Sequence, residues 1–369
     1  MTTRDDDLAA RLLHLRGATL SKGDPLALPL TLASMYHLPG DPEPGVAGYG
    51  RSDNPTWTAL EDVLTALEDA PALAFPSGMA AISAALFAVL NSGDRLLLPS
   101  DGYYTPRSLG ARFLEGLGVR VETRPTRHFA EGGFDGFRAV FVETPSNPGL
   151  DLVDLAALST AVRAAGGVTI ADNTTMTALG QRPLDLGADI LVAADTKAPG
   201  GHSDLLMGHV ATRDSDLLAA MRDWRTLAGG IPGPFEAWLL HRSLETLELR
   251  FERMCATAEV LAAALEMHPA VRDLRFPGLP SHPDHALAAR QMRRMGFLIG
   301  FTLADEVAAE RFIEACALIA PATSFGGVHT TAERRARWGD AVAPGFVRLS
   351  VGTEPTEPLV ASVLAALDG

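Results

Sequence analysis

The 369-residue sequence has little cysteine, no excess of positive charge and no long apolar run. Cys255 and Cys316 are too few for a disulfide framework or a thiolate metal cluster, which fits a reducing compartment. The formal net charge of −14 disfavours nucleic acid or an anionic membrane surface as a partner. No segment has the roughly 18 consecutive apolar residues that a membrane helix needs, and residues 1–7 contain no apolar export segment. These absences predict a cytoplasmic protein without a metal site.

The length and the placement of prolines and glycines predict an arm and two domains. Residues 1–45 become rich in proline and glycine after a short helical stretch, so we expect an arm that is mobile or lies against another surface. A cluster of glycine and proline at 229–234 marks a second boundary. We therefore predict a large domain over 46–233 and a smaller one over 234–369.

Strand-like and helix-like segments alternate through the large domain. The apolar runs predict strands over 72–75, 95–98, 139–142, 168–171 and 190–194, with helices over 79–90 and 155–165. Such alternation predicts an α/β fold with a mainly parallel sheet. After residue 234, apolar residues from Leu240 to Met254 predict one long helix. Strands over 297–302 and 346–351, with a helix over 308–316, predict a smaller α+β domain.

Lys197 is the residue to which we assign the chemistry. The apolar run Ile190–Ala194 leads into it and a glycine-rich loop follows, so the amine lies at the carboxyl end of a buried strand. Open α/β sheets build their sites there. A partly desolvated lysine can attack an aldehyde and form a Schiff base. Taken alone, a surface lysine at a strand end is the simpler reading, so the assignment depends on companion residues.

Two other strand ends supply such companions. Gly78 follows the strand at 72–75 and allows close approach to the free N–H groups that begin the next helix, which suit a phosphate. Asp172 follows the strand at 168–171 and is either a helix N-cap or the partner of a protonated ring nitrogen. A lysine, an aspartate and a phosphate cup together are what pyridoxal 5′-phosphate (PLP) requires.

These segments resemble the cysteine/methionine-metabolism family of PLP-dependent enzymes, whose members include cystathionine γ-synthase, cystathionine β-lyase, cystathionine γ-lyase and methionine γ-lyase. The resemblance extends from about residue 46 over nearly the whole chain and implies the aspartate aminotransferase-type fold, fold type I. It is carried by Tyr49-Gly50-Arg51, Asn54-Pro55-Thr56, Ser77-Gly78-Met79, Glu143-Thr144-Pro145-Ser146-Asn147-Pro148, Asp172-Asn173-Thr174, Thr196-Lys197, Gly201-His202-Ser203-Asp204 and Arg348-Leu349-Ser350-Val351-Gly352.

The resemblance implies roles around the cofactor. Lys197 would hold the PLP aldehyde and then act as general base, while Asp172 would keep the ring nitrogen protonated. Tyr103 would stack on the ring and assist proton transfer at the leaving sulfur; Tyr104 is the alternative, because the glycines that follow in the family are absent. The phosphate is expected on the backbone of Gly78 and Met79 and the hydroxyl of Thr196.

The resemblance also implies substrate contacts and an assembly. Arg348 would bind the substrate carboxylate with Asn147 and Ser324. Tyr49 and Arg51 would reach the phosphate in a neighbouring subunit, so the arm before them would cross a subunit interface. The implied assembly is a homotetramer, a dimer of dimers with shared sites.

Three departures from the family pattern bear on this site. Ala194 replaces a serine that usually lies three residues before the lysine, which removes a hydrogen bond to the phosphate or the cofactor linkage. Ala198 replaces an aromatic residue. His329 occupies a position where several γ-lyases have glutamate near the substrate entrance, so we count it among the substrate-binding candidates.

The preferred hypothesis is a carbon–sulfur lyase that cleaves L-cystathionine at Cγ–S to cysteine, 2-oxobutanoate and ammonia. The segment 320–338 resembles bacterial chains assigned as cystathionine γ-lyases. Within the family the alternatives are cystathionine γ-synthase, which replaces the γ-substituent of an acylated homoserine, and methionine γ-lyase. The non-enzymatic alternative is a PLP-binding protein that has lost its catalytic activity. The presence of Lys197, Asp172 and Arg348 together argues against it.

Overall fold

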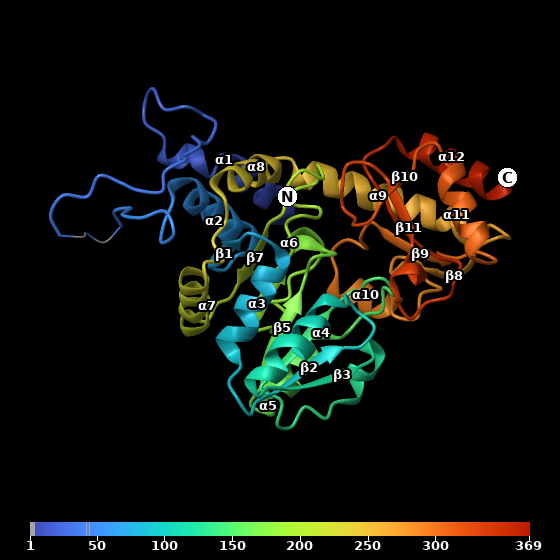
Figure 1. Cartoon of the computed structure of the whole chain (residues 1–369). Helices are drawn as coiled ribbons and strands as arrows, with labels where there is room; N and C mark the ends of the chain where they lie inside the picture. The colour runs from blue at the N-terminus through green and yellow to red at the C-terminus, as the bar shows by residue number, and fades with distance from the viewer. Residues whose placement is uncertain (1–3, 42, 44) are drawn as a thin grey trace.

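The computed structural model describes residues 4–41, 43 and 45–369, which are organised around two β-sheets (Figure 1). The larger sheet has seven strands in the order β1-β7-β6-β5-β4-β2-β3. These are β1 Ala72–Phe75, β2 Arg95–Pro99, β3 Arg120–Arg124, β4 Ala139–Glu143, β5 Val168–Asp172, β6 Ile190–Ala193 and β7 Gly208–Ala211. Strand β7 is antiparallel to both neighbours, and the other pairs are parallel. The predicted α/β large domain with a mainly parallel sheet is therefore confirmed.

Helices bury both faces of this sheet, which explains why its central strands are apolar throughout. On strand β1, Leu73 and Phe75 join the cluster built with α3 and α7, while Ala72 and Ala74 face a second cluster. Helix α5 packs on β5. The helices of this half are α1 Arg4–His14, α2 Pro55–Glu68, α3 Gly78–Val89, α4 Thr105–Leu109, α5 Leu155–Ala164, α6 Thr177–Gly180 and α7 Ser215–Ala228.

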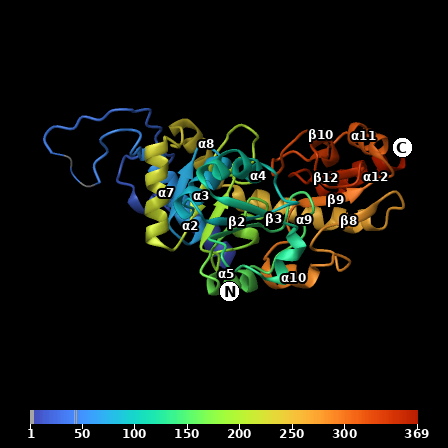
Figure 2. The same cartoon turned by 60° about the horizontal axis from the view of Figure 1, so that its bottom comes forward.

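The smaller domain holds a five-stranded sheet in the order β10-β11-β12-β9-β8, beside the large domain in Figure 2. All of its pairs are antiparallel except β10 with β11. Its strands are β8 Arg272–Arg275, β9 Leu298–Thr302, β10 Ala320–Pro321, β11 Thr331–Arg334 and β12 Phe346–Ser350, and its helices are α10 His285–Gln291, α11 Glu306–Ala315 and α12 Thr356–Asp368. This confirms the smaller α+β domain.

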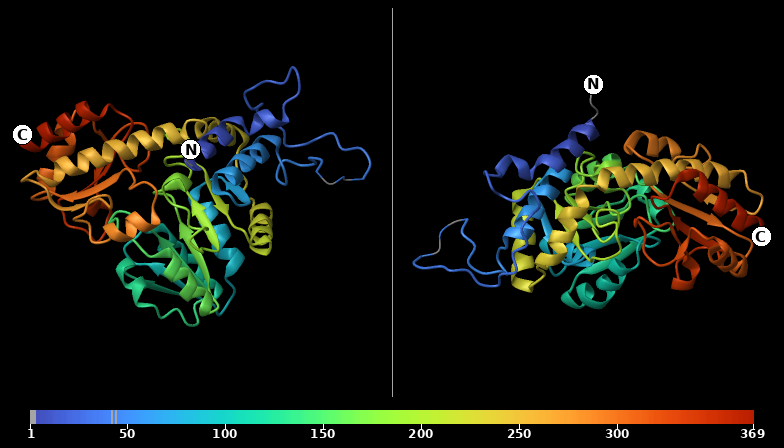
Figure 3. Two further views of the ribbon diagram at one scale, coloured as in Figure 1. Left: turned by 180° about the vertical axis from the view of Figure 1, so that it is seen from behind. Right: turned by 90° about the horizontal axis from the view of Figure 1, so that it is seen from above.

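The long helix expected from the apolar period after residue 234 is two helices. Helix α8 spans Pro234–Leu244 and α9 spans Leu247–Glu266. Thr246 between them has φ −113° and ψ 8°, outside the helical region. The apolar spacing continues through this break because Leu244 and Leu247 both point into the core. Helix α9, the gold helix in Figure 3, passes from the large domain into the small one.

The N-terminal segment, blue in Figure 1, projects from the rest of the chain before α2. Between α1 and α2 its described residues form the 3₁₀ helix Arg16–Thr19 and little other regular structure, and they expose apolar side chains such as Leu26, Leu32 and Met35. Whether it crosses a subunit interface stays a prediction, as do the domain bounds 1–45, 46–233 and 234–369. In the described parts of the chain, no helix is long and apolar enough to span a membrane.

Candidate active site

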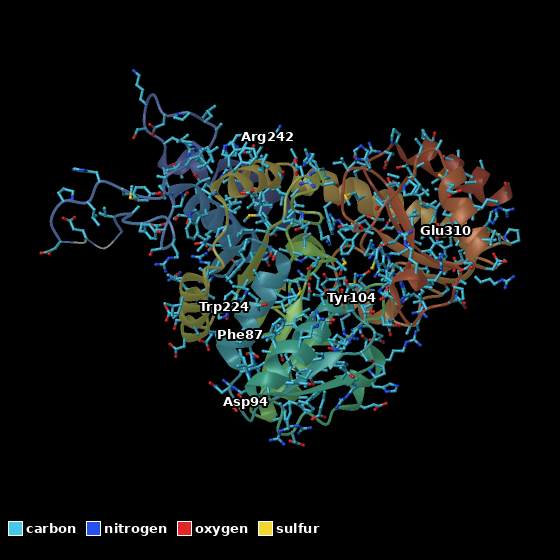
Figure 4. All side chains as sticks on the ribbon, viewed as in Figure 1. Phe87, Asp94, Tyr104, Trp224, Arg242 and Glu310 are labelled. Carbon is cyan, nitrogen blue, oxygen red and sulfur yellow. The ribbon has the colours of Figure 1, made fainter. Side chains whose placement is uncertain are left out.

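Strand ends of the large domain meet the small domain at a cavity of about 420 Å³, within the usual range for a small-molecule site. Tyr104, labelled in Figure 4, lies on this cavity between the two domains. Of the predicted site residues, the cavity brings together Gly78, Met79, Tyr103, Asn147, Asp172, Thr196, Lys197, Ser324 and Arg348.

The proposed phosphate cup begins helix α3. Ser77 is its N-cap and accepts a hydrogen bond from Ala80 N–H at 3.1 Å. A Cβ placed on Gly78 would lie 2.6 Å from the Cβ of Ala194, so only glycine fits between α3 and the loop before Lys197. The first turn of α3 thus offers N–H groups and the positive end of a helix dipole to an anion in the cavity.

Asp172 ends strand β5 and is buried at the cavity wall. It accepts the Thr174 N–H at 2.9 Å, and the Thr174 hydroxyl accepts Ala194 N–H at 2.9 Å. Burial raises the pKa of Asp172 above its ordinary value, although Thr174 and the Lys197 charge oppose this. A protonated ring nitrogen is the kind of partner that keeps such a carboxyl ionised.

Lys197 lies in the loop after β6, and its side chain is largely buried. Burial lowers its pKa to about 8; the nearby Arg348 charge adds to this effect, while Asp172 and Glu333 oppose it. Its Nζ lies 5.3 Å from the centre of the Phe325 ring. An amine with a pKa of about 8 is unprotonated in roughly a tenth of molecules at pH 7, far more than at its ordinary pKa, so it can act as nucleophile or base.

Beneath this loop lies a buried group of charges. His209 on β7 contacts the carboxylate of Asp195 at 2.9 Å and that of Glu68 at 3.3 Å. All three side chains are at most 3% exposed. Burial lowers the pKa of His209, but Asp195 and Glu68 outweigh this and raise it to about 10. Asp195 directly precedes Thr196 and Lys197, so the group supports the loop that carries them.

The two tyrosines both border the cavity, so the choice between them stays open. Tyr103 and Tyr104 meet edge to face with ring centres 5.6 Å apart, and both are partly exposed. The Tyr103 N–H donates to Glu143 at 2.8 Å.

Burial, together with the Asp172 charge, raises the pKa of Glu143 to about 8.

Arg348 on β12 reaches the cavity from the small domain with its side chain 3% exposed. It donates to Asn147 Oδ1 at 2.6 Å and to the Ser324 carbonyl at 2.7 Å. Burial lowers the pKa of Arg348 to about 10, although the Glu333 charge opposes this shift. Its guanidinium carbon lies 5.1 Å from the centre of the Phe325 ring, so Arg348 and Lys197 share that ring. A carboxylate between the two cations would face both.

Three predicted site residues lie outside this cavity in the described chain. His329 is exposed and lines an adjoining cavity of about 800 Å³. Tyr49 and Arg51 lie in the segment before α2, where Arg51 donates to the Thr226 carbonyl at 3.1 Å. Their expected action in a neighbouring subunit stays a prediction.

The departures at Ala194 and Ala198 have different settings. Ala194 borders the cavity and faces Gly78. Ala198 is fully buried, and its carbonyl accepts a hydrogen bond from Arg250 at 2.6 Å. Its backbone N lies 2.6 Å from a Cβ placed on Gly326, which shows how closely the small-domain loop approaches Lys197.

Sequence reasoning did not select several residues of this site. Phe325, Glu143, Arg335 and Trp338 line the cavity, and Glu333 binds Arg348 behind it. Phe325 adjoins the predicted Ser324, and Glu143 begins a matched motif, so these two had a local signal. The others lie in the segment 320–338, whose resemblance to γ-lyases indicated an activity but assigned no role to Glu333, Arg335 or Trp338. Among the described residues, no group of three or more His, Cys, Asp or Glu side chains is arranged so that it could hold a metal ion.

The residues present suit PLP. The α3 N-terminus offers donors for a phosphate, Asp172 offers a buried carboxylate for a ring nitrogen, and Lys197 offers a desolvated amine for an aldehyde. Arg348 retains a buried Nε without a partner among the described residues. Arg348 also lines the cavity, so it offers a cation to a further anionic group there.

Comparison with known proteins agrees with this chemistry. The family model for "Cys/Met metabolism PLP-dependent enzyme" matches residues 16–368. A Streptomyces coelicolor protein named "Putative cystathionine gamma-lyase" is 51% identical over 344 residues, covering 91% of this chain and 87% of that protein. Cystathionine gamma-lyase of Bacillus subtilis is 35% identical, covering 93% and 94%.

A solved structure has the same fold over the full length. Cystathionine gamma synthase from Xanthomonas oryzae pv. oryzae, in complex with aminoacrylate and cysteine, has a TM-score of 0.93 and 32% identity. The match covers 100% of this chain and 98% of that one. The family match and the similarity of fold carry the cofactor assignment as well. The chain therefore belongs to the PLP-dependent enzymes of cysteine and methionine metabolism.

Proposed function

We propose that the protein cleaves L-cystathionine, with water, at its Cγ–S bond to give cysteine, 2-oxobutanoate and ammonia. The observation that carries the proposal is that Lys197 and Arg348 both lie near the Phe325 ring, in a cavity that Asp172 also lines. When bound, PLP supplies an electron sink for the bonds broken at the substrate α-carbon. The 51% identical relative supports the γ-lyase assignment over the other family members.

The residues divide the work by charge and position. Arg348 holds the substrate α-carboxylate, with Asn147 and the Ser324 segment orienting its guanidinium. Lys197 moves protons between Cα and the neighbouring carbons, for which a pKa of about 8 is suited. Tyr103, or Tyr104 in its place, donates a proton to the departing sulfur.

We also propose that four copies assemble with shared active sites, in the cytoplasm. The segment before α2 supports this, because Leu26, Leu32 and Met35 are 86%, 74% and 78% exposed on it. Apolar side chains on an arm are typical of a surface buried by a partner. Tyr49 and Arg51 would then complete the neighbour's phosphate site. Light scattering on the full chain tests this, and a monomer would contradict it.

One alternative activity has specific support. The solved cystathionine gamma synthase matches the whole chain, so γ-replacement on an O-acylhomoserine is the alternative reaction. Separate incubations with cystathionine, with O-succinylhomoserine plus cysteine, and with methionine distinguish the activities. We expect cysteine, 2-oxobutanoate and ammonia in equal amounts from cystathionine. Faster formation of cystathionine from the second mixture would make the protein a synthase, and methanethiol from the third a methionine γ-lyase.

A further inference from the structure

A buried carboxylate lies behind the guanidinium of Arg348. Glu333 on β11 is the direct cross-strand partner of Arg348 on β12 in the antiparallel ladder. Its side chain is 0% exposed and accepts a hydrogen bond from Arg348 Nη2. Glu333 does not line the cavity, whereas Arg348 does. The glutamate therefore acts on whatever occupies the cavity only through the side chains that it holds, which are Arg348, Arg335 and Trp338.

Glu333 is itself held in place from its other side. Its carboxylate accepts hydrogen bonds from Arg335 Nη1 at 2.8 Å and from Trp338 Nε1 at 2.9 Å. Arg335 is fixed in turn by Asp340, which accepts from its Nε at 2.7 Å. A carboxylate with donors on several sides cannot rotate freely, and charge-assisted hydrogen bonds at low dielectric are strong. Glu333 is thus a fixed acceptor for Arg348.

The contacts of Arg348 show what this acceptor achieves. Asn147 accepts a hydrogen bond from Nη1, whereas the Ser324 carbonyl and Glu333 both accept from Nη2. Only Nε lacks a partner among the described residues. Three acceptors on two nitrogens fix the guanidinium plane, and a forked donor binds a carboxylate well only in a fixed plane. Without Glu333, Arg348 and Arg335 would be two buried cations with no carboxylate between them.

We propose that Glu333 is a positioning residue for recognition of the substrate α-carboxylate. It orients Arg348 toward the cavity and offsets the repulsion between Arg348 and Arg335. The inference rests on the proposed function of Arg348 as carboxylate ligand. It adds that affinity for amino acids, as opposed to simple amines, depends on a residue that does not touch the substrate.

The test compares an amino acid with the matching amine on the PLP-loaded enzyme. L-norleucine and 1-pentylamine share a chain and an amine, differ in the carboxylate, and lack a leaving group at Cγ. Their Kd values are measured from the change in cofactor absorbance. For Glu333→Gln we expect the Kd of norleucine to rise roughly tenfold or more, as for loss of a charged hydrogen bond, and that of pentylamine to change less than about threefold.

Glu310→Gln provides a matched control. Glu310 on α11 accepts from Arg334 Nε at 2.8 Å, so it pairs with the residue next to Glu333 on the same strand. Glu310 is labelled in Figure 4 on the small domain, away from Tyr104. We expect both Kd values to stay at the wild-type level in this variant. Thermal unfolding of each protein without substrate checks that the folds are comparable.

The outcomes separate this inference from the proposed function. If the Kd values of both ligands rise equally in Glu333→Gln, or if the Kd of norleucine is unchanged, the positioning role is overturned. A wild-type enzyme that binds both ligands equally well contradicts the role of Arg348 instead. If Glu333→Gln does not fold, Glu333→Asp retains the charge but withdraws the acceptor from Arg348. The Kd of norleucine must then rise while that of pentylamine stays nearly constant. If the Kd of norleucine does not rise selectively, the inference is overturned.

Discussion

The cofactor side and the substrate side of the cavity are built differently. The cofactor side consists of strand and helix ends of the large domain, where Gly78, Asp172 and Thr196 offer backbone groups and short side chains. The proposed substrate side lies mainly in the small domain, where the buried charges of Arg348, Glu333 and Arg335 pair with one another, and the large domain adds Asn147. The first depends on local chain geometry, and the second on pairs formed between strands.

This difference separates two kinds of effect. Changes on the cofactor side should affect bond breaking, because we propose that Lys197 and Asp172 contact the cofactor. Changes on the substrate side should affect the capture of the carboxylate, because Arg348 is the buried cation that we propose to bind it. The two sides meet at Phe325, whose ring is within 5.3 Å of Lys197 Nζ and 5.1 Å of the Arg348 guanidinium carbon.

The largest effect is expected from Lys197→Ala. Loss of the amine removes both the covalent attachment and the base, so kcat with cystathionine should fall by about 10³-fold or more. Lys22→Ala is the matched control, because Lys22 is the only other lysine in the sequence. Product assays on both variants test this. Turnover by Lys197→Ala without added amine would contradict the assignment.

A smaller and different effect is expected from Arg348→Lys. The ammonium keeps the charge but cannot form the planar fork, so KM should rise roughly tenfold or more while kcat changes less. Arg334→Lys on the neighbouring strand β11 is the control and should leave KM unchanged. Steady-state kinetics with cystathionine provide both constants. A drop in kcat at constant KM would remove the distinction between the two sides.

The smallest effect concerns stability and pH. Asp195 and Glu68 raise the pKa of His209 to about 10, above its ordinary value. Its stabilising contribution is therefore complete below about pH 6.5 and is lost as the pH rises through about 10. The histidine can account for at most about 1.4 kcal/mol of lost unfolding free energy per pH unit in that window.

Urea unfolding across this pH range tests the histidine. His209→Gln should show a flatter decline in the free energy of unfolding than the wild type, while His202→Gln, at an exposed residue, should follow the wild type. Parallel profiles for His209→Gln and the wild type would mean that His209 is neutral in the folded protein.

The same contrast explains what the sequence could predict. The runs ending at Phe75, Asp172 and Ala193 are short, apolar and followed by loops, so both the strands and their functional ends could be located. Family resemblance added Arg348 and Asn147, which the structure brings within 2.6 Å across 201 residues. Their assigned roles stay predictions.

Other features depend on long-range pairing and left no local pattern. Strand β11 reads Thr-Ala-Glu-Arg, without apolar alternation, and Glu333 gains its place only through the register with β12. Strand β7 is four residues long and contains the buried His209, whose partners come from α2 and the loop after β6. The break at Thr246 leaves no trace in the apolar spacing, because α8 and α9 both bury apolar side chains at the same helical spacing.

The central claim is that Lys197 carries the cofactor, and the sequence allows a direct test. Reduction of the PLP-loaded protein with borohydride fixes the cofactor to its lysine, and peptide mass spectrometry then locates the added mass. Lys22 and Lys197 are the only two lysines in the sequence. The mass on the peptide containing Lys197, and none on Lys22, is the predicted result. The mass on Lys22, or on neither lysine, would contradict the account.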